Sequence, residues 1–255
     1  GIGVGIVAGL VIPPLATHLL RGHEGHNLYN IGFTAGFVGL LLTNILRGFS
    51  FNPEPLSIWG TNFNGPLRWL MLLLTFSMIL VGYFINERSF KGYKAIFKES
   101  GVLVTDFVNI LGFGNTLINM GVVGFIGMLY IEIVGGHYNG ATLGGLLTII
   151  GFGAFGKQPK NILPVMIGVY LGTIFSPFNP SDPGPLLAAL FVTTLAPLAG
   201  KFGPLVGIVV GFTHLSAVNF TGILHGGLNL YNNGFTGGLI ATVFVGILNG
   251  YKEKE

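Results

Sequence analysis

The sequence has no cysteine and very few charged residues. Without cysteine there are no disulfides and no thiolate metal sites. Only 8% of the 255 residues are charged and 51% are hydrophobic, whereas soluble domains carry about 25% charged residues. A water-soluble surface cannot be built from so few charges. The formal charge of +3 comes from a few loop lysines and arginines, so we expect no nucleic-acid partner.

Catalytic motifs are also missing. The sequence has no Ser-His-Asp context, no His-Glu-x-x-His motif and no phosphate-binding P-loop. Its glycine runs lie inside hydrophobic segments, where the strand and helix of a dinucleotide-binding unit are lacking. We therefore expect that the protein is not an enzyme and uses no cofactor and no metal.

Long hydrophobic segments are what the sequence does contain. About 20 apolar residues cross a hydrocarbon core roughly 30 Å thick as a helix. The sequence therefore predicts an all-α integral membrane protein, embedded in a lipid bilayer, with many of its 43 glycines inside the helices. The nine predicted segments are roughly 1–20, 28–48, 66–86, 117–134, 138–156, 161–176, 184–200, 202–222 and 228–250.

A tenth apolar stretch, Gly101 to Asn115, is too short for a full span and carries Asp106 and Asn109. It predicts a half-helix or a re-entrant segment.

One loop is strongly basic and orients the chain. It holds Arg88, Lys91, Lys94 and Lys98, so the positive-inside rule places residues 88–98 in the cytoplasm of a multi-pass protein of the cell membrane. Strict alternation of the segments then puts further lysines, Lys157, Lys160 and Lys201 among them, on the same side.

The sequence repeats itself at an offset of 202 residues. Residues 1–50 align with 203–252 without a gap, and 19 of the 50 positions are identical. Because the copies start seven predicted segments apart, they should have opposite orientations in the membrane, as an inverted repeat with broken helices. We divide the chain into the end of a first repeat half (1–50), a connecting span with the basic loop (51–100) and a second half (101–255). Since Gly1 lies inside an apolar run, we expect an N-terminal part to be missing.

A Tyr-Asn motif occurs three times, as Tyr29-Asn30, Tyr138-Asn139 and Tyr231-Asn232. Asparagine near glycine breaks helices, and broken backbone at membrane depth must be buried or line a wet cavity. The alternative is an interfacial cap, with Tyr in the aromatic belt. We expect each Asn at a helix start and these motifs along a solute path.

Symmetry gives that path two constrictions. Phe33 and Phe235 occupy equivalent repeat positions and are expected to narrow the path on either side of the midplane.

Few ionisable residues lie in apolar stretches. Asp106 and Glu132 could carry protons, although Asp106 could equally cap a helix and Glu132 could reach the interface. His23 and His225 are repeat-equivalent and could gate or relay protons, the alternative being interfacial solvation.

Two families are similar to this chain. Three stretches carry the first resemblance: His225 to Phe235, Leu195-Ala196-Pro197, and Gly151 to Lys157. They resemble an uncharacterised bacterial membrane family, catalogued as a domain of unknown function with two homologous halves. Tyr138-Asn139-Gly140 followed by small residues resembles, more weakly, the urea transporters, which favours a small polar solute.

The predicted function is a channel or facilitator for a small neutral polar solute. Two alternatives stay open, a secondary transporter coupled to protons through Asp106 or Glu132, and a membrane scaffold without transport. A homo-oligomer is compatible with each.

Overall fold

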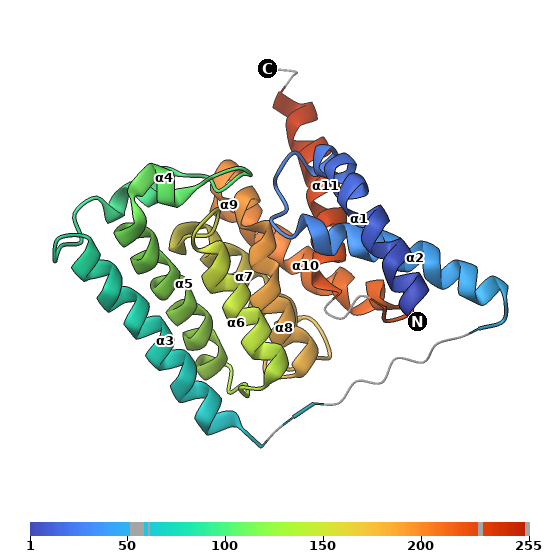
Figure 1. Ribbon diagram of the computed structural model, residues 1–255, viewed down its shortest axis with the longest axis horizontal. Coiled ribbons are helices and arrows are strands. Elements are labelled where there is room, and N and C mark those ends of the chain that lie inside the picture. Colours follow the sequence, from blue (N-terminus) through green and yellow to red (C-terminus); the bar gives the residue numbers. More distant parts are fainter. Residues whose placement is uncertain (52–58, 61, 229–231, 253–255) are drawn as a thin grey trace.

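The protein is all-helical throughout the part of the chain described by the computed structural model, residues 1–51, 59–60, 62–228 and 232–252. Figure 1 shows the helices in one bundle, with α3 at one side, α1 and α2 at the other. The helices are α1 (Ile2–His23), α2 (Asn30–Gly48), α3 (Asn64–Ile85), α4 (Phe107–Leu111), α5 (Phe113–Ile133), α6 (Gly140–Phe152), α7 (Pro159–Ile174), α8 (Pro183–Phe191), α9 (Ala196–Phe202), α10 (Pro204–Leu224) and α11 (Asn233–Lys252), with short 3-10 helices η1 (Tyr93–Lys98) and η2 (Val192–Leu195).

Seven of these segments are long and apolar enough to cross a membrane, with α8, η2 and α9 together forming one of them. The all-α membrane class is confirmed. The helix in the predicted segment 138–156 is shorter than expected, because α6 has 13 residues, or about 20 Å of helix. The helix α7 has 16 residues, the same number as the predicted segment 161–176, or about 24 Å of helix. Residues 153–158 join the end of α6 to the start of α7, and most of them are buried in the interior of the protein.

The expected half-helix is a single short helix. Residues 107–111 form α4, and Gly112, with φ 81°, separates it from α5, which takes in Asn115. Gly203, with φ 98°, separates α9 from α10 in the same way. Positive φ favours glycine, so each corner needs a residue without Cβ.

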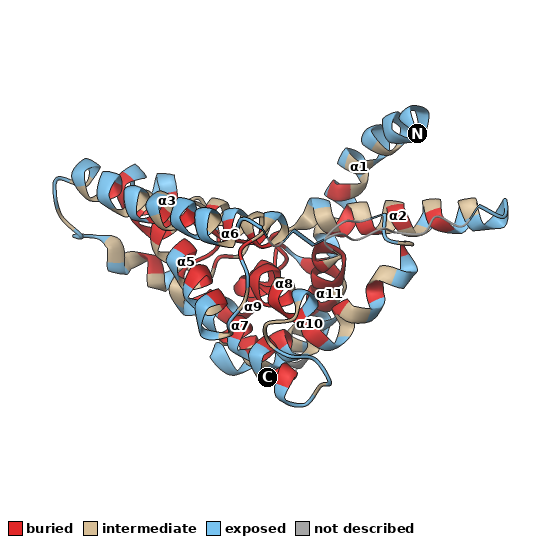
Figure 2. Cartoon of the chain, turned by 90° about the horizontal axis from the view of Figure 1, so that it is seen from below, coloured by how far each residue is buried: buried red, intermediate tan, exposed pale blue. Residues whose placement is uncertain are grey.

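Glycine also sets the closest helix contact, between α7 and α10. A Cβ on Gly168 would lie 2.1 Å from the carbonyl oxygen of Ile208, and a Cβ on Gly211 would lie 2.1 Å from that of Val165. Small residues let membrane helices approach to backbone contact. The most buried span, residues 183–202, lies at the centre of the bundle (Figure 2).

The two repeat copies meet where α2 crosses α11. A Cβ on Gly32 would lie 3.2 Å from the Cα of Gly234, and a Cβ on Gly234 would lie 2.9 Å from the Cα of Gly32. Reciprocal contacts between equivalent residues are what a two-fold axis produces. We call this contact the repeat junction.

Candidate functional site

Each repeat copy holds an asparagine in the same hydrogen-bond network at the repeat junction. Asn30 Oδ1 lies 3.0 Å from His23 Nε2, and Asn30 Nδ2 donates to the carbonyl of Ala16 at 2.8 Å. In the other copy, Asn232 Oδ1 lies 2.7 Å from His225 Nε2, and Asn232 Nδ2 donates at 2.5 Å to the carbonyl of Val218, the repeat counterpart of Ala16. Both histidines are therefore buried partners of the asparagines and are not solvated at an interface.

The third motif starts a helix elsewhere in the bundle. Asn139 caps α6 by accepting hydrogen bonds from the backbone of Ala141 and Thr142, both at 3.0 Å. All three asparagines thus lie at helix starts, as expected. Tyr138 is buried, Tyr29 is half-buried, and Tyr231 lies outside the described residues.

Phe33 and Phe235 fill the repeat junction. Their ring centroids are 6.3 Å apart, and only 3% and 1% of these residues are exposed. Each ring also lies edge-on to the histidine of its own copy, at 5.7 Å from His23 and 5.8 Å from His225. The junction is closed in this structure.

Asp106 is a helix cap. Its Oδ1 accepts from the backbone N–H groups of Val108 at 2.9 Å and Asn109 at 3.2 Å, at the start of α4. Of the two interpretations of Asp106, these contacts match capping.

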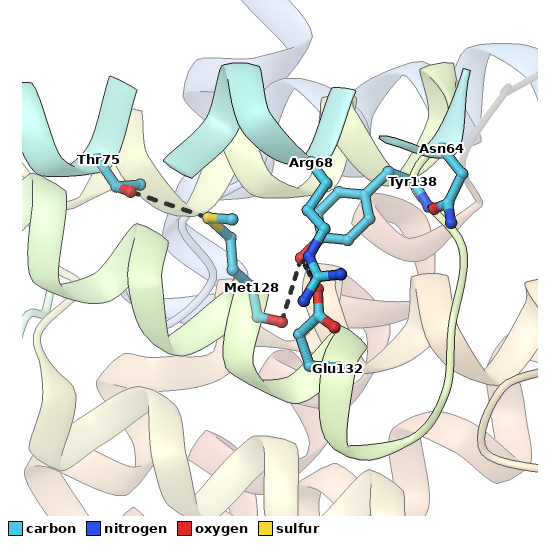
Figure 3. Close-up of polar contacts among 6 residues, drawn as sticks. All are labelled: Asn64, Arg68, Thr75, Met128, Glu132 and Tyr138. Atoms are coloured by element: carbon cyan, nitrogen blue, oxygen red, sulfur yellow. Dashed lines mark hydrogen bonds and ion pairs between the residues drawn. The ribbon is translucent and has the colours of Figure 1, made fainter. Parts of the chain in front are cut away.

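Glu132 lies in an ion pair at the edge of the bundle. Its Oε1 is 2.9 Å from Arg68 Nε and accepts a hydrogen bond at 2.9 Å from the hydroxyl of Tyr138 (Figure 3). The side chains of Arg68 and Glu132 are 54% and 37% exposed, so solvent weakens the pair.

Replacing Glu132 with glutamine should therefore have a small effect. Glutamine can still accept from Tyr138, and an exposed ion pair contributes about 1 kcal/mol or less. We expect the free energy of unfolding in detergent to change by no more than that, and solute flux in vesicles to stay within about twofold. A loss of flux in Glu132→Gln with unchanged stability would show that the Glu132 carboxylate takes part in transport.

One buried cation was not recognised in the sequence. Lys157 has no exposed surface, and its Nζ donates to the hydroxyl of Tyr29 and, at 3.4 Å, to the carbonyl of Thr148. Nζ also lies 4.5 Å from the ring centre of Tyr29 and 5.1 Å from that of Phe152. Within the described residues, the ion pair of Arg68 is the only one found, so Lys157 has no carboxylate partner there.

Burial changes the chemistry of this amine. Desolvation holds the pKa of Lys157 well below its usual value of 10.5. The sequence predicts that Lys157 lies with other lysines on one side of the membrane, and it does not indicate that the side chain is buried. Nothing in the local sequence signals its burial, because the segments that cover it are distant in sequence.

The segments around Lys157 are irregular and polar. The backbone N–H of Leu28 donates to the Thr194 carbonyl at 3.0 Å, that of Tyr29 donates to Thr194 Oγ1 at 2.9 Å, and Thr194 Oγ1 donates to Asn27 Oδ1 at 2.5 Å. Thr193 Oγ1 lies 3.4 Å from the Tyr29 hydroxyl. We call Asn27, Tyr29, Lys157, Thr193 and Thr194 the polar hub.

The polar hub exists because three helix interruptions meet there. The loop after α1, the turn between α6 and α7, and the 3-10 helix η2 all free backbone groups from helical bonding. Asn119 supplies hydrogen bonds to two backbone carbonyls of the turn between α6 and α7. Its Nδ2 donates to the carbonyls of Gly153 at 2.7 Å and Lys157 at 2.8 Å. Non-helical backbone at membrane depth is tolerated where it is buried in protein or lines a cavity, and these segments are buried.

Two buried polar atoms, one in the hub and one beside it, have no hydrogen-bond partner in the described part of the chain. Among the described residues, neither His26 Nε2 nor Asn27 Nδ2 has a hydrogen bond. His26 stacks on Phe202, with centroids 5.6 Å apart, and burial lowers its pKa below 6.5. These two atoms are hydrogen-bonding capacity that the described residues leave unused.

The hub and the repeat junction adjoin each other. A Cβ on Gly237 of α11 would lie 2.6 Å from Thr194 and 3.2 Å from Asn27 Oδ1. Phe33 lies one helical turn after Tyr29, and its backbone N–H donates to the Tyr29 carbonyl at 3.0 Å. One continuous region thus joins the polar hub to the aromatic contact of Phe33 and Phe235.

Comparison with known families identifies the chain at the family level. The family model described as "Protein of unknown function (DUF1576)" matches residues 1–48 and 85–250. The chain belongs to this family. The DUF1576 match includes the repeat junction and the polar hub, whereas Arg68 and nearly all of α3 lie outside it. No curated protein and no solved structure matches the chain. The expected membership of a family of unknown function is confirmed, and the resemblance to urea transporters stays a prediction.

Proposed function

We propose that this protein conducts a small, neutral polar solute across the membrane through the region of the polar hub and the repeat junction. The observation that carries the proposal is the polar hub itself, a group of hydroxyl and amide side chains placed among apolar helices around a single buried cation. Within the described residues this cation has no carboxylate partner. Hydrogen-bonding groups of this kind replace the hydration of a neutral solute, while apolar rings exclude hydrated ions.

An inverted repeat would build such a path. The reciprocal contacts at Gly32 and Gly234 support a two-fold relation between the copies, and α1 and α10 run in opposite directions in Figure 1. We propose that the axis lies in the membrane plane, which places the solute path at the junction between copies. Phe33 and Phe235 then form the gate, and conduction requires their rings to separate.

The proposal is tested by swelling of reconstituted vesicles in gradients of urea or glycerol. Replacing Asn30 or Asn232 with leucine removes the junction amide, and we expect solute flux to fall at least tenfold in each variant. Asn139→Leu should also lower flux if the third motif lines the path. Asn44→Leu is the matched control, because Asn44 is exposed on α2 and, among the described residues, bonds only to the carbonyl of Leu40 in its own helix, at 2.9 Å.

Unchanged flux in both junction variants, with the protein still folded by circular dichroism, would remove the junction from the path. Absence of flux for every neutral solute tried with the unmodified protein would favour a scaffold role.

A second candidate is a proton-coupled transporter, and Lys157 is the observation that favours it. A buried amine whose pKa is lowered from 10.5 can bind and release a proton nearer to neutral pH than an exposed lysine can. The sequence pointed instead to Asp106 and Glu132, which lie in a helix cap and an exposed ion pair. Flux that depends on a pH gradient in the unmodified protein and loses that dependence in Lys157→Met would support coupling over passive conduction.

A further inference from the structure

The helices α1 and α10 carry nearly the same sequence at their starts. Residues 4–9 read Val-Gly-Ile-Val-Ala-Gly and residues 206–211 read Val-Gly-Ile-Val-Val-Gly. Each hexapeptide contains two glycines four residues apart, the spacing that puts both on one face of a helix and allows close approach of a second membrane helix.

In α10 both glycines of the pair lie against other helices. A Cβ on Gly207 would lie 2.6 Å from the Cβ of Ala199 and 2.8 Å from the Cβ of Pro164, and a Cβ on Gly211 would lie 2.1 Å from the Val165 carbonyl oxygen. Any side chain at either position would therefore collide with α9 or α7. The glycines are needed because α7 packs directly on the backbone of α10.

In α1 the same pair faces open space. A Cβ on Gly5 or on Gly9 would meet nothing within 4 Å. Figure 2 shows the N-terminal part of α1 standing away from the rest of the bundle. Glycine in a helix costs about 1 kcal/mol relative to alanine, so the pair destabilises α1 without any compensating contact within the described residues.

We propose that the Gly5 and Gly9 face of α1 binds another membrane-spanning helix with the packing face of α7. Such a helix is apolar and has small residues one turn apart, as α7 has at Gly168 and Gly172. The other repeat copy indicates this occupant. There, α10 packs against α7 at Gly207 and Gly211, the counterparts of Gly5 and Gly9. The site goes beyond the solute path, since it serves assembly.

The repeat copy also predicts the register. On α10, Pro164 lies against Gly207, Gly168 against Gly211, and Gly172 against Leu215, so α7 and α10 run in the same direction. The bound helix should therefore run parallel to α1, with its counterpart of Gly168 at Gly9.

The test uses the whole chain in lipid nanodiscs and a synthetic peptide of residues 159–176 as the probe. Because the chain has no cysteine, Gly1→Cys gives a single site for a fluorescent donor. We expect saturable energy transfer to an acceptor on the N-terminus of the peptide, and weaker transfer to an acceptor on its C-terminus. Gly9→Leu in the chain should weaken binding at least tenfold, and so should Gly168→Leu in the peptide.

Gly3→Leu is the matched control. Gly3 also faces open space, and its repeat counterpart is already an exposed leucine, Leu205. Binding that survives Gly3→Leu and fails in Gly9→Leu supports the proposal. Equal binding in both variants would overturn it, and so would self-association of labelled chains through α1 that Gly9→Leu abolishes, because the face would then take a second copy of α1.

Discussion

Replacing Gly238 with alanine is expected to lower the free energy of unfolding by about 3 kcal/mol, at the upper end of the usual cost of overpacking. A Cβ at this position would lie 2.0 Å from two ring carbons of Phe33, whose ring is buried at the repeat junction. The ring also packs against Phe37 and Phe235, so a shift of the ring must displace these side chains. Unfolding in detergent, followed by circular dichroism, measures the change.

Gly246→Ala is the control on the same helix. A Cβ there meets nothing within 4 Å, so the variant should be as stable as the unmodified protein or more stable by up to about 1 kcal/mol. If Gly238→Ala changed the free energy of unfolding no more than Gly246→Ala does, the junction would not be tightly packed.

The repeat predicts the same destabilisation at the equivalent glycine of the other copy. Gly36, the counterpart of Gly238, lies against Phe235, with a Cβ 2.3 Å from the ring, so Gly36→Ala should cost a similar amount. Phe33→Ala by itself leaves a cavity and costs about 3–5 kcal/mol. Combined with Gly238→Ala it should cost clearly less than the sum, because the clash is gone. Additive losses would place Gly238 away from Phe33.

Replacing Lys157 with methionine is expected to stabilise the protein at neutral pH. The unfolded chain has the usual lysine pKa near 10.5, and the folded protein has a lower one because burial disfavours the charge. Between these two values the unfolded state binds more protons, so stability rises with pH by up to about 1.4 kcal/mol per unit. Methionine keeps the volume and removes the charge, so the variant should gain stability and lose this slope.

Lys160→Met is the matched control, since Lys160 is exposed and three residues away. Its stability should change by about 0.5 kcal/mol or less, as for an ordinary surface substitution. Urea unfolding at several values between pH 6 and 9 separates the two variants. A slope in pH that persists in Lys157→Met would assign it to another group, and a large loss of stability would show that the contact between Lys157 and the Tyr29 hydroxyl outweighs desolvation.

The sequence by itself determined the class of the protein and the elements of its repeat. Low charge and long apolar segments are enough to identify a membrane protein, because the bilayer excludes every other solution for such a composition. Asn139 caps α6 as expected, since capping depends on neighbours close along the chain. Asn30 and Asn232 also lie at helix starts, but their side chains bond to groups of the preceding helix. The capping interpretation of Asp106 was available for the same reason.

Only the tertiary structure decided how these residues are used. Lys157 looks like a loop lysine in sequence and is fully buried, because residues more than a hundred positions away cover it. Gly9 and Gly211 lie in almost identical hexapeptides, yet Gly211 contacts α7 and Gly9 contacts nothing. Local sequence fixes conformation through short-range sterics and hydrogen bonds, whereas burial and close approach depend on which distant segments fold against it.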